Sequence, residues 1–267
     1  MRKPGPDSAS LTSRHQSPAG RGESAKETKY RRLAEVAAQD DAERQRGIKL
    51  LRVLSGDPHK PYIALTFDDG PHGTKTTELL DLLKKLRCPS TFFVVGAQVR
   101  RYPELVQRMV VEGHELGNHT FNHYRLTRIP LDEVGDELNR TRALLRAIVG
   151  SSSRLFRPPG GEYNPEILKI VEKNGYTTVL WTDDPADYKA ERTPGDLERL
   201  VLRDITPGGI ILLHDGIDAT LKALPNIVQS LRNKGYIFTT VSGLIQHGGG
   251  IEIVRNFNIS KTSARFR

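Results

Sequence analysis

Two patterns of apolar residues alternate along most of the chain. Short apolar runs, typical of buried strands, are separated by stretches in which apolar residues recur every three or four positions, typical of amphipathic helices. The strand-like runs lie at residues 62–67, 90–95, 114–119, 154–158, 177–181, 209–214 and 236–241. The helix-like runs lie between them, at residues 76–86, 102–113, 131–150, 164–175, 194–205 and 223–235.

Strands that alternate with helices are typical of parallel sheets joined by crossover helices. The pattern therefore predicts an α/β fold close to a (β/α) barrel, over residues 56–246. Residues 1–55 are predicted to form an extension that is disordered at first and helical over about 26–46, where apolar residues recur at helical spacing. Residues 247–267 form a Gly-rich and then basic tail with no assigned structure.

Composition restricts the class of protein. The 267 residues are 37% hydrophobic and 27% charged, which fits a globular domain with a sizeable core. One cysteine excludes a disulfide framework and a Cys-rich zinc site. No apolar run is long enough for a transmembrane segment.

The net charge of +8 is uneven, since residues 1–60 hold 13 Lys or Arg against 8 Asp or Glu. We interpret the excess as a solvated tail, with attraction to an anionic surface as an alternative, and expect no nucleic-acid partner. The basic N-terminus has no apolar segment of the kind found in secretory signals.

Ionisable residues gather where the strand-like runs end. In a βα barrel the active site lies at the C-terminal ends of the strands. The residues found there are Asp68, Asp69, His119, His123, Arg157, Asp183 to Asp187, and His214. This clustering favours one catalytic site over a set of unrelated turns.

His119 and His123 are four residues apart in HTFNH, a spacing that one helical turn would place on one face. Two imidazoles and a carboxylate can bind one metal ion. Of the adjacent Asp68 and Asp69, one would bind the metal and the other would act as general base. Arg157 would orient that base.

Two further roles follow from residue chemistry. The backbone N–H of Gly160, the first available donor after two prolines, could stabilise an oxyanion. His214, backed by a carboxylate, could protonate a leaving group.

Five motifs resemble one known family. LTFDDGPHGT, HTFNH, FRPPGG, DPADY and ILLHD match, in order, the motifs of the polysaccharide deacetylase (NodB-homology) family, carbohydrate esterase family 4. The resemblance covers about residues 60–245. It implies a distorted, TIM-like (β/α)7 barrel and metal-dependent removal of N-acetyl groups from N-acetylglucosamine polymers such as peptidoglycan, chitin or chitooligosaccharide. Some relatives instead remove O-acetyl groups from xylan.

The resemblance also implies residue roles. It makes Asp68 the general base and Asp69, His119 and His123 the ligands of one divalent ion, with Zn²⁺ favoured and Co²⁺, Ni²⁺ or Mn²⁺ as alternatives. The other implied residues are Arg157 (orienting the base), Gly160 (oxyanion donor), His214 (general acid), Asp187 (tuning the acid), Leu212 or else Leu213 (acetyl pocket), and Tyr188 (sugar packing). Tyr188 stands where the family usually has Trp, and Gly160 where it often has Tyr.

The sequence indicates the class of partner but no location. The expected partner is an acetylated glycan, but its identity and the oligomeric state are not specified by the sequence. The family usually acts outside the cytoplasm, whereas no secretory signal is visible, so we assign no location.

Several other functions compete with the N-deacetylase. The alternatives are an O-acetyl esterase, a hydrolase of another non-peptide C–N bond, a two-His-one-carboxylate iron oxygenase, and a sugar-binding module with decayed catalysis. The second aspartate, Arg157 and His214 favour hydrolysis, because an oxygenase needs no such acid–base pair.

Overall fold

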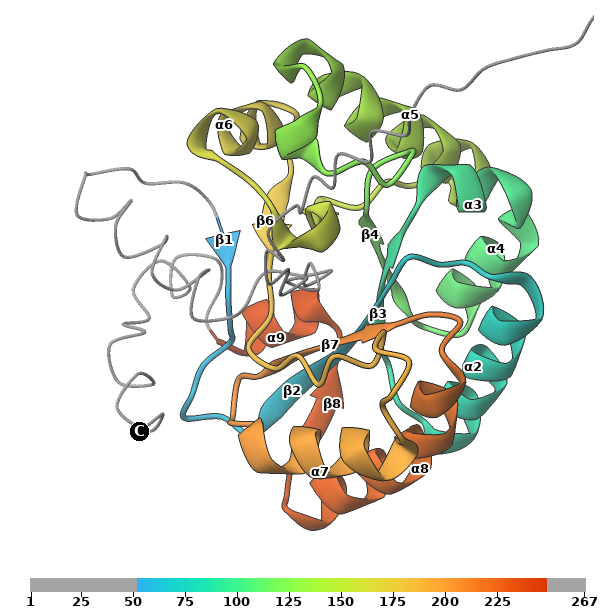
Figure 1. Ribbon diagram of the computed structural model, residues 1–267, viewed down its shortest axis with the longest axis vertical. Helices are drawn as coiled ribbons and strands as arrows, with labels where there is room; N and C mark the ends of the chain where they lie inside the picture. Colours follow the sequence, from blue (N-terminus) through green and yellow to red (C-terminus); the bar gives the residue numbers. More distant parts are fainter. Residues whose placement is uncertain (1–51, 249–267) are drawn as a thin grey trace, which may run out of the picture.

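A computed structural model describes residues 52–248, which form one parallel sheet surrounded by helices (Figure 1). The predicted helix over 26–46 and nearly all of the tail lie outside these residues. The strands are β1 (Arg52–Val53), β2 (Tyr62–Asp68), β3 (Thr91–Val94), β4 (Glu115–Asn118), β5 (Leu155–Phe156), β6 (Thr177–Val179), β7 (Ile210–His214) and β8 (Ile237–Thr239). Each of the seven predicted strands is therefore present.

The sheet is a distorted barrel. Its strand order is β1-β6-β5-β4-β3-β2-β7, and all of the pairs are parallel. The first residues of β2 pair with β8, while residues from Ala64 onward pair with β7. The end strands are not joined by a continuous ladder. A single parallel bridge between Asp183 and Ile211 joins the segment after β6 to β7.

Helices cover the outside of the sheet (Figure 1). They are α2 (Gly73–Leu86), α3 (Gly96–Arg101), α4 (Pro103–Val111), α5 (Leu131–Val149), α6 (Pro165–Lys173), α7 (Pro194–Asp204), α8 (Asp218–Asn233) and α9 (Val241–His247). Asn164 caps α6, and a capping box formed by Thr193 and Asp196 begins α7. None of the helices within residues 52–248 is long and apolar enough to cross a membrane.

The structure differs from the sequence prediction at short elements. β1 lies within the segment assigned to the extension, yet Arg52 and Val53 are buried and pair with β6. Residue 241, predicted as the end of a strand, instead begins α9, where the Thr240 side chain accepts a hydrogen bond from Gly243 N. α3 was not predicted, and α8 begins five residues before the predicted helix over 223–235.

The two faces of β2 separate the core from the barrel interior. Ile63, Leu65 and Phe67 are fully buried in a cluster with apolar side chains of the surrounding helices. Thr66 and Asp68 point to the opposite face because side chains alternate along a strand. These polar side chains lie inside the barrel, at the end where the candidate site is found.

Candidate active site

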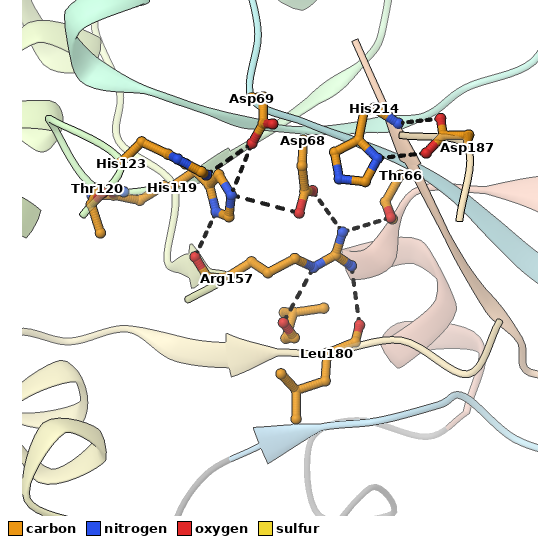
Figure 2. Close-up of polar contacts among 12 residues, drawn as sticks. Thr66, Asp68, Asp69, His119, Thr120, His123, Arg157, Leu180, Asp187 and His214 are labelled. Atoms are coloured by element: carbon orange, nitrogen blue, oxygen red, sulfur yellow. Dashed lines mark hydrogen bonds and ion pairs between the residues drawn. The ribbon is translucent and has the colours of Figure 1, made fainter. Parts of the chain in front are cut away.

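The ends of four parallel strands bring the candidate residues together (Figure 2). Asp68 is the last residue of β2 and lies in register with His214, the last residue of β7. His119 directly follows β4, and Arg157 directly follows β5. Parallel strands place their C-terminal ends at one edge of the sheet, so residues up to 146 positions apart share one site.

Asp69, His119 and His123 form a cluster with metal-ligand geometry. Their ligand atoms all lie within 4.8 Å of one another. The Asp69 Oδ1 atom is 3.4 Å from His119 Nε2 and 3.0 Å from His123 Nε2. Burial by itself would raise the pKa of Asp69, but hydrogen bonding to the two imidazoles and their charges outweigh it, and the pKa lies well below its usual range. Asp69 is therefore in the ionised form that a metal ligand requires.

The path that brings the two histidines together is not the predicted helical turn. Residues 119–125 are not helical: residues 121–122 form a bend, and Thr120 and His123 have φ angles of +64° and +60°. Left-handed residues interrupt a right-handed helix. The Asn118 side chain accepts a hydrogen bond from Thr120 N at 2.9 Å, which favours a local turn instead.

These residues fit a divalent metal ion. His119 Nδ1 lies 2.7 Å from the carbonyl oxygen of Arg157, which can only accept, so Nδ1 carries the proton. This leaves Nε2 as the lone-pair donor, the usual arrangement for a metal-binding histidine. The buried Nε2 atoms of His119 and His123 both point at the shared Asp69 oxygen, and within residues 52–248 neither makes a hydrogen bond to any other group.

Asp68 and Arg157 form a fully buried ion pair beside this cluster. Arg157 Nη1 donates to Asp68 Oδ1 at 2.8 Å and to Thr66 Oγ1 at 2.7 Å. Its Nη2 donates to the Leu180 carbonyl at 3.0 Å. The guanidinium thus has several fixed partners, and it holds one carboxylate oxygen of Asp68. The other oxygen, Oδ2, lies 3.7 Å from His119 Nε2, on the side of the Asp69, His119 and His123 cluster.

His214 and Asp187 form a second buried pair. His214 Nδ1 donates to Asp187 Oδ1 at 2.6 Å, and His214 N donates to Asp187 Oδ2 at 2.8 Å. Thr220 Oγ1 also donates to Oδ2, at 2.6 Å. Burial would lower the pKa of His214, but the carboxylates of Asp187, Asp69 and Asp68 outweigh it and raise the pKa above its ordinary value. The imidazole therefore holds its proton more firmly than a solvated histidine.

Two further carboxyls near the site have raised pKa values. Burial raises the pKa of Asp184 to about 6, although the Ala186 N–H and His214 act in the opposite direction. Burial likewise raises the pKa of Asp215 to about 6. Thr76 donates to Asp215 at 2.5 Å, beneath Gly70, where an added Cβ would meet this carboxylate. Asp215 thus ties α2 to the end of β7.

The remaining predicted residues lie around the same edge. Gly160 is buried in a 3-10 turn (η2, Pro159–Gly161) with φ +66°, a left-handed conformation that suits glycine. Leu212 is fully buried and faces the same side as His214, whereas Leu213 packs in the helix-side cluster. The Tyr188 ring stands edge-on to His214, with a centroid distance of 5.4 Å.

Sequence reasoning missed two side chains that complete the buried pairs. Thr66 links Arg157 to the Ile211 carbonyl, which it contacts at 2.7 Å. Its position two residues before Asp68 on the same strand face was a usable signal. Thr220 lies in α8 and has no such signal in the sequence.

Comparison with known proteins gives consistent results. The polysaccharide deacetylase family model matches residues 55–179. A peptidoglycan-N-acetylglucosamine deacetylase of Bacillus cereus is 38% identical over 192 residues, covering 69% of this chain and 88% of that protein.

Solved structures agree with the barrel architecture. The structure of Bacillus subtilis PdaA, a family 4 carbohydrate esterase, has a TM-score of 0.71 and 31% identity, covering 79% of this chain and 89% of that one. The wild-type BA3943 protein of Bacillus anthracis, a family 4 pseudoenzyme, has a TM-score of 0.70 and 29% identity, covering 74% and 70%. Because the fold occurs with and without activity, the residues of the site indicate function and the fold alone does not. The motifs, the distorted (β/α) barrel and these relatives show that the chain belongs to the polysaccharide deacetylase family, carbohydrate esterase family 4.

Proposed function

We propose that this protein hydrolyses the N-acetyl group of N-acetylglucosamine residues in a polysaccharide. One observation supports this most directly: two separate buried pairs, Asp68 with Arg157 and His214 with Asp187, lie beside a metal-ligand cluster (Figure 2). A base and an acid next to one metal position suit the hydrolysis of an amide. The name of the Bacillus cereus relative supports N-acetylglucosamine as the sugar.

Asp69, His119 and His123 would hold the ion, and we propose Zn²⁺. Two imidazoles and a carboxylate are a common catalytic zinc ligand set that leaves a coordination position for water or substrate. When bound, a divalent ion lowers the pKa of its water toward about 7 and polarises the substrate carbonyl. Co²⁺, Ni²⁺ and Mn²⁺ remain alternatives that the same ligands accept.

Asp68 would act as the general base. Its Oδ1 is held by Arg157, so Oδ2 is the oxygen that faces the ligand cluster. In that position Oδ2 can take a proton from the attacking water as the new C–O bond to the acetyl carbon forms. Arg157 fixes the carboxylate through a charge-assisted hydrogen bond.

His214 would act as the general acid. Its Nδ1 is committed to Asp187, so the proton for the leaving group comes from Nε2. The C–N bond breaks as the nitrogen receives this proton, and the products are acetate and a glucosamine amine. The raised pKa of His214 keeps the proton available until that step.

Gly160, Leu212 and Tyr188 would bind the substrate. The Gly160 N–H would donate to the developing oxyanion, and such donors contribute roughly 10²–10³-fold to turnover. Leu212 would receive the acetyl methyl group, because it is an apolar residue on the inward face of β7. Tyr188, beside the acid, would contact the sugar ring.

Acetate release is the direct test of this proposal. Protein freed of metal by chelation and reloaded with Zn²⁺ would be incubated with chitin oligomers, peptidoglycan fragments and acetylxylan. We expect acetate from the first two substrates, matched by an equal amount of new amine. Acetate from acetylxylan alone would identify an O-acetyl esterase. Dioxygen consumption without acetate would identify an oxygenase and refute the hydrolase proposal.

A further inference from the structure

The segment between the two histidine ligands is held by a carboxylate from outside the site. Glu137 Oε2 accepts hydrogen bonds from Phe121 N at 3.0 Å and from Asn122 N at 2.8 Å. Its Oε1 accepts from Asn122 Nδ2 at 2.6 Å. Three donors of a two-residue segment therefore converge on one side chain of α5.

Because Glu137 is buried, these hydrogen bonds compensate the cost of burying its charge. The residue is 4% exposed, and a buried carboxylate is costly unless hydrogen bonds compensate it. The Arg140 guanidinium lies 3.8 Å away, beyond hydrogen-bonding distance, and its side chain is half exposed. The loop donors are thus its shortest contacts, and hydrogen bonds to a carboxylate are roughly twice as strong as neutral ones.

The segment that Glu137 holds, residues 121–122, lies between two residues with unfavourable backbone conformations. Thr120 and His123, on either side of it, both have left-handed φ angles, a conformation that L residues other than glycine adopt at a cost. Fixing the Phe121 and Asn122 peptide units leaves the adjacent His123 little freedom to leave the position facing Asp69. A displacement of about 1 Å is enough to impair a functional site, so the carboxylate acts on the ligand set through the loop.

We propose that Glu137 is a positioning residue of the metal site, holding His123 where its Nε2 atom faces Asp69 Oδ1. It touches no ligand atom and has no part in the proton transfers described above. The inference rests on the proposed function only in assuming that Asp69, His119 and His123 bind a divalent ion.

A charge exchange with Asn122 tests this role. Glu137→Gln turns the charge-assisted hydrogen bonds into weaker neutral ones, because the Asn122 amide can turn so that its oxygen accepts from the new NH₂. Asn122→Asp alone places two carboxylates in contact. The double variant Asn122→Asp with Glu137→Gln restores a charge-assisted hydrogen bond between the two side chains, with its donor reversed, and preserves the net charge. Glu133→Gln, an exposed position on the same helix, is the matched control for loss of one negative charge.

Co²⁺ is the probe, measured by its visible d–d absorption and by competition with a chelator. We expect Glu137→Gln to weaken Co²⁺ binding by at least about tenfold, the lower end of the effect of outer partners on metal sites. Its spectrum should change, while the double variant should return toward wild type. Glu133→Gln should bind like wild type.

Thermal unfolding of the metal-free variants separates positioning from a general effect on the fold. A lowered melting temperature in Glu137→Gln with unchanged Co²⁺ affinity and spectrum would overturn the proposal, as would a double variant that binds no better than Glu137→Gln. If Glu137→Gln fails to fold, the Co²⁺ affinity and spectrum of the double variant, compared with those of the wild type, test the proposal. Since no substrate is used, failure of the deacetylase proposal would leave this result intact.

Discussion

Replacing Asp68 by Asn tests whether the two adjacent aspartates have different functions. Arg157 offers only donors, so it selects the Asn oxygen and turns the amide NH₂ toward the position now held by Oδ2. That NH₂ faces the ligand cluster and cannot accept a proton from water. The variant should therefore lose its base while keeping Asp69 and both histidines in place.

The size of each effect can be estimated from the contacts. A positioned base contributes at least about 10²-fold to turnover, which is about 2.7 kcal/mol in the activation free energy. Removing one charge of a fully buried ion pair lowers the free energy of unfolding by about 3–5 kcal/mol. The bonds that Arg157 keeps to Thr66, to the Leu180 carbonyl and to the Asn oxygen place the expected drop toward the lower end of this range.

Three measurements on matched variants decide the question. Metal content by atomic spectroscopy, acetate release and urea unfolding would be compared for Asp68→Asn and Asp69→Asn. Asp68→Asn should keep stoichiometric metal, whereas Asp69→Asn should lose it, because an amide is a poorer ligand than a carboxylate. A metal-free Asp68→Asn, or one that retains more than about a tenth of wild-type activity, would show that the division of labour is wrong.

The other predictions concern the acid, its carboxylate partner and the N-terminal segment. His214→Ala should lower turnover by roughly 10²–10⁴-fold with unchanged metal content, and near-normal turnover would remove His214 from the mechanism. Because the acid must be protonated, kcat/KM should fall as the pH rises through the raised pKa of His214. Asp187→Asn should move this fall to lower pH, and an unmoved profile would contradict the role of Asp187. A chain that begins at residue 50 keeps β1 and should retain activity on a soluble oligomer. Loss of that activity would mean that the removed residues contribute to the barrel.

The fold was predictable where elements are long enough to show a period. The run at 62–67 is apolar except for Thr66, and it forms most of β2. α3 has six residues and α9 seven, which is too short for a helical period to be recognised. The pairing of β1 with β6 depends on contacts between residues 126 positions apart, such as Arg52 with Thr178, and no local pattern encodes them.

The site was predictable in its chemistry more than in its geometry. Ionisable residues at the ends of parallel strands had to meet at one edge, and Asp68, His119, Arg157 and His214 do meet there. The helical turn expected between the histidines was wrong, since a spacing of four is also spanned by a bend. The role of Glu137 was not predicted, because the sequence of an amphipathic helix does not show which of its polar residues are buried.

The backbone at Asp69 explains how two consecutive residues can serve one site. In an extended strand their side chains would point to opposite faces, and Asp68 already points inward with Thr66. Asp69 would then lie against the helices, in the apolar cluster that holds Phe67. Instead its φ angle is +75°, so a left-handed residue directly follows the end of the strand. Aspartate tolerates this conformation better than most residues. The turn brings the second carboxylate back to the histidines, and the pair of charges is separated by its partners: Arg157 holds the first carboxylate, and the two imidazoles hold the second.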